Sequence, residues 1–117
     1  MQSIDSALTN GPVFLEFYTT GCEYCQQEKP IIDQLKSEYP GVTFLEVNAM
    51  DNKDLANAFG VTGVPQMDVI VKKNADGSYV YATISGSTTG DRQGSRIIGF
   101  TQKSNLEKAI NAALSAR

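Results

Sequence analysis

The sequence predicts an α/β fold, a single domain over residues 1–117 with a central mixed sheet of about four strands flanked by helices. Two patterns predict this fold. Short apolar runs, typical of buried strands, alternate with segments whose apolar residues recur every three or four positions, as in helices. Alternating helices and strands in the first half imply a parallel crossover, and an Asn-Ala-Asp-Gly turn in the second half implies an antiparallel hairpin.

The first half of the chain contains two expected helices and two expected strands. Residues Gln2 to Leu8 fit a short amphipathic helix that ends at an Asn-Gly-Pro stop. Val13 to Tyr18 is almost entirely apolar and β-prone, which favours a strand buried on both faces. Helical spacing then runs from Cys22 to about Tyr39, with Pro30 inside it, and Val42 to Val47 follows as the second strand.

The second half begins with a third helix and a hairpin. Asp51 stands where it would cap a short helix that runs to Phe59. Beyond this helix, Gln66 to Lys73 and Ser78 to Ile84 are the expected antiparallel strands on either side of the turn.

The end of the chain combines a polar segment, a short strand and a terminal helix. Ser85 to Arg96 is rich in glycine and polar residues, so a mobile loop is expected there. Ile97-Ile98 is expected to add an edge strand. Ser104 and Glu107 are spaced as a capping box at the start of the terminal helix. The apolar stripe of that helix consists of Leu106, Ile110, Ala113 and Leu114.

Composition and charge exclude several classes of partner. The net charge of −3 and the isoelectric point near 4.8 argue against nucleic acid, because phosphate binding needs a basic face. No apolar run approaches the roughly 20 residues that span a bilayer, and the first residues lack the pattern of a signal peptide. We therefore expect a soluble monomer without nucleic-acid or membrane contacts. The sequence carries no cofactor signature.

Cysteine usage is more informative. The chain has two cysteines, Cys22 and Cys25, and no histidine. A structural zinc site needs about four Cys or His ligands, so the count argues against a metal site. A cysteine–histidine catalytic pair is excluded because there is no histidine. A dithiol or disulfide pair remains, or two structural cysteines.

The Cys22-Glu23-Tyr24-Cys25 motif lies where a buried strand passes into a helix. At the first turn of a helix, unpaired backbone amides and the helix dipole stabilise an anion, which favours the reactive thiolate of Cys22. Cys25 lies three residues further on the same helical face, within reach to resolve a mixed disulfide. We expect Cys22 to be the exposed, attacking sulfur and Cys25 the buried one. The alternative is a structural pair without redox chemistry.

A set of residues stands in a recognisable order along the chain: Phe14-Leu15-Glu16-Phe17-Tyr18, Cys22-Glu23-Tyr24-Cys25, Pro30, Asn48, Gly63-Val64-Pro65 and Gly99. In this order they resemble the thioredoxin family, from about Val13 to Leu114. The resemblance implies a thioredoxin fold. The chain begins at the family's first helix, without the N-terminal strand, as expected for a piece trimmed from a longer protein.

The resemblance also implies roles for individual residues. Cys22 is the expected nucleophile and Cys25 the resolving thiol. Pro65 is the expected cis-proline facing the dithiol; the alternative is an ordinary proline at the start of a strand. Val64 is expected to offer backbone hydrogen bonds to an extended substrate. The remaining expected substrate-binding residues are Glu23, Tyr24 and Gly99.

Glu16 stands where the family usually has a buried aspartate beneath the dithiol. Buried there, its carboxyl would have a raised pKa and would exchange a proton with Cys25. The alternative is a solvent-facing glutamate at a strand end. Glu46 occupies a position where the family often has a lysine, so either one of the two carboxylates turns to solvent or one holds a proton.

Two departures from the family pattern bear on function. Gly21 replaces the usual tryptophan before the first cysteine, and Glu23-Tyr24 replaces the Gly-Pro of general thioredoxins. The negative charge of Glu23 disfavours a neighbouring thiolate and makes the disulfide less oxidising. The hypothesis is therefore a reductant.

The expected function is a thiol–disulfide oxidoreductase, a protein disulfide reductase that is recharged by an upstream thiol reductant. One alternative is an extracytoplasmic thioredoxin-like domain of a longer anchored protein, serving secreted or haem-maturation partners. A second alternative is a non-catalytic binding module with a structural dithiol. The chain as it stands is expected to be cytoplasmic, and extracytoplasmic if it is a trimmed fragment.

Overall fold

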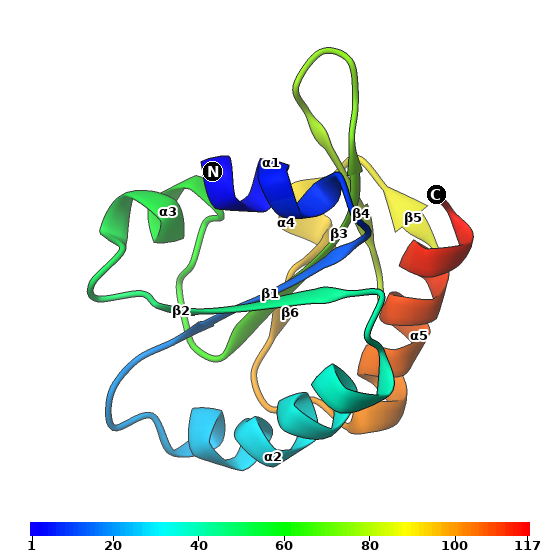
Figure 1. The fold of residues 1–117 in the computed structure, drawn as a ribbon. Coiled ribbons are helices and arrows are strands. Elements are labelled where there is room, and N and C mark those ends of the chain that lie inside the picture. The colour runs from blue at the N-terminus through cyan, green and yellow to red at the C-terminus, as the bar shows by residue number, and fades with distance from the viewer.

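The computed structural model describes residues 1–117 as five helices packed against a six-stranded sheet (Figure 1). The helices are α1 (Gln2–Leu8), α2 (Glu23–Glu38), α3 (Lys53–Ala58), α4 (Arg92–Ser95) and α5 (Lys103–Ser115). The strands are β1 (Val13–Tyr18), β2 (Thr43–Asn48), β3 (Gln66–Lys73), β4 (Tyr79–Ala82), β5 (Thr88–Thr89) and β6 (Ile97–Ile98). None of the helices is both long and apolar enough to cross a bilayer.

The sheet is mixed, in the strand order β2-β1-β3-β4-β5, and β6 pairs with β3. β1 and β2 run parallel and are joined by the crossover through α2, whereas the other pairs are antiparallel. This arrangement confirms the predicted thioredoxin fold with its mixed sheet. The four main strands are accompanied by two strands of two residues each, the expected edge strand β6 and β5, which the sequence did not predict.

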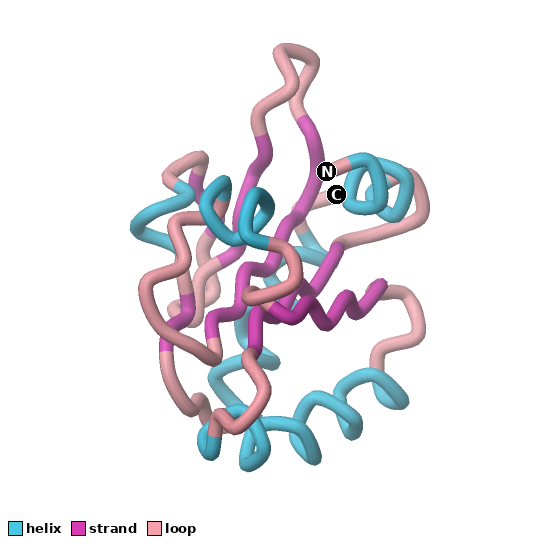
Figure 2. Tube along the Cα trace, turned by 90° about the vertical axis from the view of Figure 1, so that its left-hand side faces the viewer, coloured by secondary structure: helices cyan, strands magenta, loops and turns pink.

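Helices cover both faces of the sheet, which lies between them as a central layer (Figure 2). Side chains alternate across a strand, so neighbouring residues of β1 belong to different cores. Phe14 packs with Ile32 of α2 and Leu106 of α5. Leu15 and Phe17 join the core under α1 and α3. Glu16 follows the alternation of Phe14 and therefore faces α2.

The segment from residue 85 to 96 is more regular than expected. In place of a loop throughout, it contains β5 and the one-turn helix α4. Asp91 forms the N-cap of α4, where its side chain accepts a hydrogen bond from the amide of Gly94. The expected edge strand at Ile97-Ile98 is confirmed as β6.

Two predicted helix caps are wrong. Asn52, not Asp51, is the N-cap of α3, and no side chain caps that helix. The N-cap of α5 is Gln102, so Ser104 and Glu107 form no capping box. Glu107 instead accepts a hydrogen bond from the hydroxyl of Tyr39 at 2.8 Å, a contact that joins α5 to the end of α2.

Candidate active site

The two cysteines lie at the start of α2. Cys22 is the N-cap residue, with an extended backbone, and its sulfur accepts a hydrogen bond from the amide of Cys25 at 3.1 Å. Their Cα atoms are 5.2 Å apart and the sulfurs form a disulfide. Cys22 is half-buried, whereas Cys25 is 7% exposed. Cys22 is therefore the more exposed of the two cysteines, as expected.

A cavity of about 460 Å³ opens beside the disulfide. It is formed where the end of β1, residues 19 to 21, the first two turns of α2 and one residue of β2 meet. Its lining includes Glu16, Tyr18, Cys22, Cys25, Lys29 and Glu46. The structure thus brings both cysteines and the predicted proton carrier to one hollow.

Glu16 is buried in the middle of the sheet, with 3% of its surface exposed. In the strand register it lies between Glu46 of β2 and Met67 of β3. Burial raises the pKa of Glu16 to about 7, and the charges of Glu46 and Glu28 push it in the same direction. The alternative of a solvent-facing glutamate is thereby excluded.

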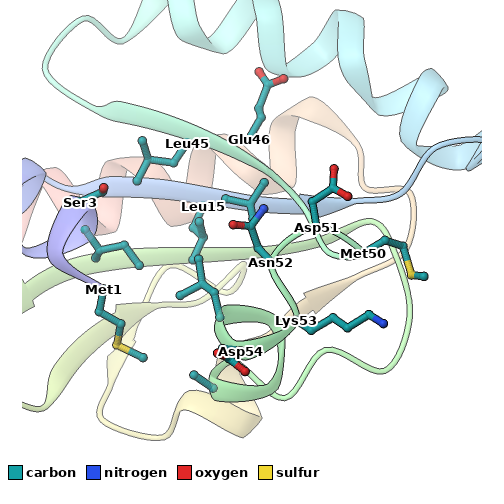
Figure 3. Close-up of a pocket in the computed structure, with 14 residues that line it drawn as sticks. Met1, Ser3, Leu15, Leu45, Glu46, Met50, Asp51, Asn52, Lys53 and Asp54 are labelled. Carbon is teal, nitrogen blue, oxygen red and sulfur yellow. The ribbon is translucent and has the colours of Figure 1, made fainter.

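Glu46 is neutralised by two lysines of α2. Its carboxylate lies 3.0 Å from the ammonium of Lys29 and 3.1 Å from that of Lys36. Figure 3 shows its side chain pointing toward α2. Of the two neighbouring acids, Glu46 is therefore ion-paired near the surface and Glu16 is the one that favours its protonated form. A signal for this pairing exists in the sequence. Lys29 and Lys36 are seven residues apart, which places both on one face of a helix.

The Val64–Pro65 peptide bond is cis, as expected. The carbonyl of Pro65 accepts a hydrogen bond from the amide of Gly99 at 2.8 Å. Gly99 has a φ of +89°, a left-handed conformation that glycine adopts without strain. Val64, Pro65 and Gly99 form this second group and do not line the cavity beside the disulfide.

The two residues between the cysteines lie on the outside of the molecule. Glu23 is exposed in the first turn of α2, and Tyr24 is 60% exposed. Their position beside Cys22 is compatible with contact to a docked substrate.

Glu28, which the sequence did not single out, is completely buried on α2. Its Oε1 accepts a hydrogen bond from the amide of Thr101 at 2.7 Å. A signal for its burial exists in the sequence, because the buried residues of α2 are Cys25, Glu28, Ile32 and Leu35, spaced three, four and three apart.

A larger cavity, of about 960 Å³, lies away from the disulfide, between α1, β2 and α3 (Figure 3). Its lining is mainly apolar and contains no cysteine. Glu46 borders both cavities, but its carboxylate points to α2. Both cysteines therefore line the smaller of these two cavities. The candidate site is identified by the redox chemistry of its sulfurs and not by the volume of the cavity.

The thioredoxin family model matches residues 2–112. The chain belongs to the thioredoxin family. A thioredoxin of Chlamydia pneumoniae is 26% identical over 94% of this chain and 90% of its own length. Chloroplastic thioredoxin M4 of Arabidopsis thaliana is 31% identical over 88% of this chain.

Some relatives are much longer proteins. The chain spans 45% of the length of the Arabidopsis protein, and 19% of protein disulfide isomerase-like 2-2 of Oryza sativa subsp. japonica, which is 35% identical over 58% of this chain. Among solved structures, thioredoxin NaTrxh from Nicotiana alata has a TM-score of 0.72 at 24% identity, covering 97% of this chain and 83% of its own. Membership of the thioredoxin family and the Cys22–Cys25 pair support thiol–disulfide oxidoreductase chemistry.

Proposed function

We propose that this thioredoxin-family protein reduces protein disulfides through the Cys22–Cys25 dithiol. The observation that carries the proposal is the arrangement of the sulfurs. A half-buried Cys22 at the N-cap of α2 is joined to a buried Cys25 in a cavity that also holds Glu16. The helix N-terminus stabilises negative charge on the Cys22 sulfur, and the thiolate is the attacking species.

The first step is attack by the Cys22 thiolate on one sulfur of the substrate disulfide. The substrate S–S bond breaks, a mixed disulfide forms between Cys22 and the substrate, and the other substrate sulfur leaves as a thiolate that takes up a proton.

The second step releases the substrate. Cys25 gives its proton to the Glu16 carboxylate, and its thiolate attacks the Cys22 sulfur. The mixed disulfide breaks, the second substrate sulfur leaves as a thiolate that takes up a proton, and the Cys22–Cys25 disulfide remains. The substrate has gained two electrons and two protons, and an upstream dithiol reductant returns the same number to the protein.

The proposed substrate contacts come from two groups of residues, one at the cis-proline and one beside Cys22. The backbone of Val64, beside cis-Pro65, is suited to pair with an extended substrate segment, as in strand addition. The exposed side chains of Glu23 and Tyr24 directly follow Cys22. The amide of Gly99 donates a hydrogen bond to the carbonyl of Pro65.

Reduction of an insulin-type disulfide substrate tests the proposal. The wild type is expected to reduce it with a dithiol as electron donor. Cys22→Ser is expected to abolish turnover, because the attacking sulfur is gone. In the absence of the dithiol donor, pre-reduced Cys25→Ser is expected to trap a mixed disulfide that is visible by non-reducing gel electrophoresis, because the resolving thiol is gone.

Two outcomes would overturn the proposal. A Cys22 that resists a small alkylating reagent in the reduced protein would indicate a structural dithiol in a binding module. A measured potential near −120 mV, typical of a strong oxidant, would reverse the direction of electron flow.

A further inference from the structure

Glu28 is a buried carboxyl that the exchange mechanism does not use. It lies on α2 three residues after Cys25, and none of its surface is exposed. Its Oε2 has no hydrogen-bond partner, whereas its Oε1 accepts the amide of Thr101 at 2.7 Å. Burying a carboxyl costs free energy unless hydrogen bonds compensate for the lost water. The hydrogen bond from the amide of Thr101 is the one that Glu28 makes in its buried position.

Thr101 belongs to a short turn between β6 and α5 that also reaches the cis-proline. The hydroxyl of Thr101 donates to the carbonyl of Gly99 at 3.0 Å. The amide of Gly99 donates in turn to the carbonyl of Pro65 at 2.8 Å. A continuous series of hydrogen bonds therefore leads from α2, one turn beyond Cys25, to Pro65.

The two ends of this series lie next to the groups proposed to act on a protein substrate, Cys25 on α2 and the backbone of Val64 beside Pro65. Cys25 and Glu28 are neighbours on one helix face, with Cβ atoms of such pairs about 5–6 Å apart. β6 pairs Ile98 with Gln66, the residue after Pro65, so the 99–101 turn leaves the sheet beside the cis-proline. A shift of that turn would move the Pro65 backbone relative to the dithiol helix.

We propose that Glu28 is a positioning residue. Through the hydrogen bond that it accepts from the amide of Thr101, it fixes the position of the Val64–Pro65 segment relative to the dithiol helix. The inference rests on the proposed function, in which this segment binds the backbone of a protein substrate. A small disulfide that makes no backbone contact there does not need the segment. Glu28 therefore governs the affinity for extended polypeptide substrates, whereas its effect on the pKa of Glu16 would act on both kinds of substrate alike.

The hydrogen bond from Thr101 needs an acceptor oxygen and not a negative charge. Gln at position 28 retains such an oxygen at nearly the same place, whereas Met has a similar length and none. Glu38, on the same helix, is exposed and pairs with Lys103 at 2.8 Å, so Glu38→Met is a matched surface control.

The experiment compares these variants on two substrates, an insulin-type protein disulfide and the small aromatic disulfide 5,5′-dithiobis(2-nitrobenzoate). Glu28→Met is expected to raise KM for the protein substrate about 10-fold, equivalent to about 1.4 kcal/mol of binding, and to change turnover of the small disulfide less than about twofold. Glu28→Gln and Glu38→Met are expected to stay near wild type on both.

An unchanged KM for the protein substrate in Glu28→Met overturns the inference, as does an equal loss on both substrates, which would assign Glu28 to fold stability alone. If that variant does not fold, Thr101→Val removes the hydroxyl bond to Gly99 while keeping the side-chain shape. It is expected to raise the same KM about twofold to threefold, and no rise overturns the inference.

Amide hydrogen exchange separates this inference from the proposed function. Exchange at Gly99 and Thr101 is expected to be slow in the wild type and in Glu28→Gln, and at least about 10-fold faster in Glu28→Met. If the wild type reduces no protein disulfide, the proposed function fails. In that case the exchange data still decide whether Glu28 holds the turn, and equal exchange in all variants overturns that role.

Discussion

At the scale of single residues, Glu16 has the least ordinary environment in the site. The core around β1 withdraws its carboxyl from water, and this burial is the main cause of its raised pKa of about 7. Glu46 and Glu28 add repulsion, while the ammonium of Lys29 acts in the opposite direction. A carboxyl with a pKa near neutrality can both accept and return a proton at physiological pH, which suits a dithiol that cycles between two states.

Replacement of Glu16 by Gln is expected to slow reduction of a protein disulfide by at least about 10-fold at pH 7.5, because the proton acceptor for Cys25 is lost. In the wild type, the single-turnover rate of the resolving step is expected to rise with pH through about 7 as Glu16 ionises. Stopped-flow measurements from pH 5.5 to 9 check both expectations.

Glu46→Gln is the matched control for that experiment. It retains Glu16 but removes a negative charge that raises the pKa of Glu16, so the inflection is expected to move to lower pH. An inflection near pH 7 that persists in Glu16→Gln would contradict the assigned role.

The sequence predicted the cysteines and Glu16 because each belongs to a short motif with a fixed place in a strand or at a helix start. It did not predict Glu28, because a lone glutamate in a helix normally faces solvent. Its spacing from Ile32 and Leu35 places it on the buried face of α2, but its hydrogen-bond partner Thr101 lies 73 positions further along the chain. The pairing of Glu46 with Lys29 and Lys36 was also missed: the spacing of the lysines places both on one face of α2, but their approach to β2 is a tertiary contact.

At the scale of elements, the segment from residue 85 to 96 differs most from the prediction. β1 and β3 were predicted at their observed bounds, since apolar runs and β-prone residues report a buried strand directly. The polar segment has no such pattern. α4 is a single turn that depends on the Asp91 cap and on Arg96, whose Nη1 donates to the carbonyl of Gly60 at 2.6 Å. Such tertiary contacts produce no periodic pattern of apolar residues in the sequence.

Arg96→Met is expected to lower the free energy of unfolding by about 1–2 kcal/mol, because the Gly60 carbonyl loses a charge-assisted hydrogen bond. Urea unfolding of the oxidised protein measures the change. Arg92→Met is the matched control, since Arg92 approaches Gly60 without a hydrogen bond to it, and a loss below about 0.5 kcal/mol is expected. Equal losses in both variants would show that the Gly60 bond contributes nothing specific.

At the scale of the whole molecule, three carboxyls are buried on the two faces of one sheet. Glu16 and Glu28 lie on the side of α2, and Asp68 lies on the opposite side with α1 and α3. Burial raises the pKa of Asp68 to about 6, although the side-chain amide of Gln66 donates a hydrogen bond to its Oδ2 at 2.9 Å. The fold therefore contains several acids that bind protons more tightly than the unfolded chain does.

This difference fixes the sign of the pH dependence of stability. The pKa of Glu16 is about 7 in the folded state and 4.5 in the unfolded state. Between these two pH values, the folded protein therefore binds more protons than the unfolded chain does. Stability then falls as pH rises from about 4.5 to 7, and Asp68 adds the same trend between about 3.8 and 6. The pKa values of Asp5 and Asp76 are lowered from 3.8, so these two residues change the stability only below about pH 3.8.

The oxidised protein is therefore expected to be more stable at pH 5.5 than at pH 8, by on the order of 2 kcal/mol. The chain has no histidine and its cysteines are in a disulfide, so few other side chains titrate in this interval. Urea unfolding at the two pH values measures the difference. Glu16→Gln is expected to remove most of it, Asp68→Asn a smaller part, and exposed Asp54→Asn none. A wild type whose stability is constant or rises toward pH 8 would show that Glu16 is not a buried, protonated acid in the folded protein.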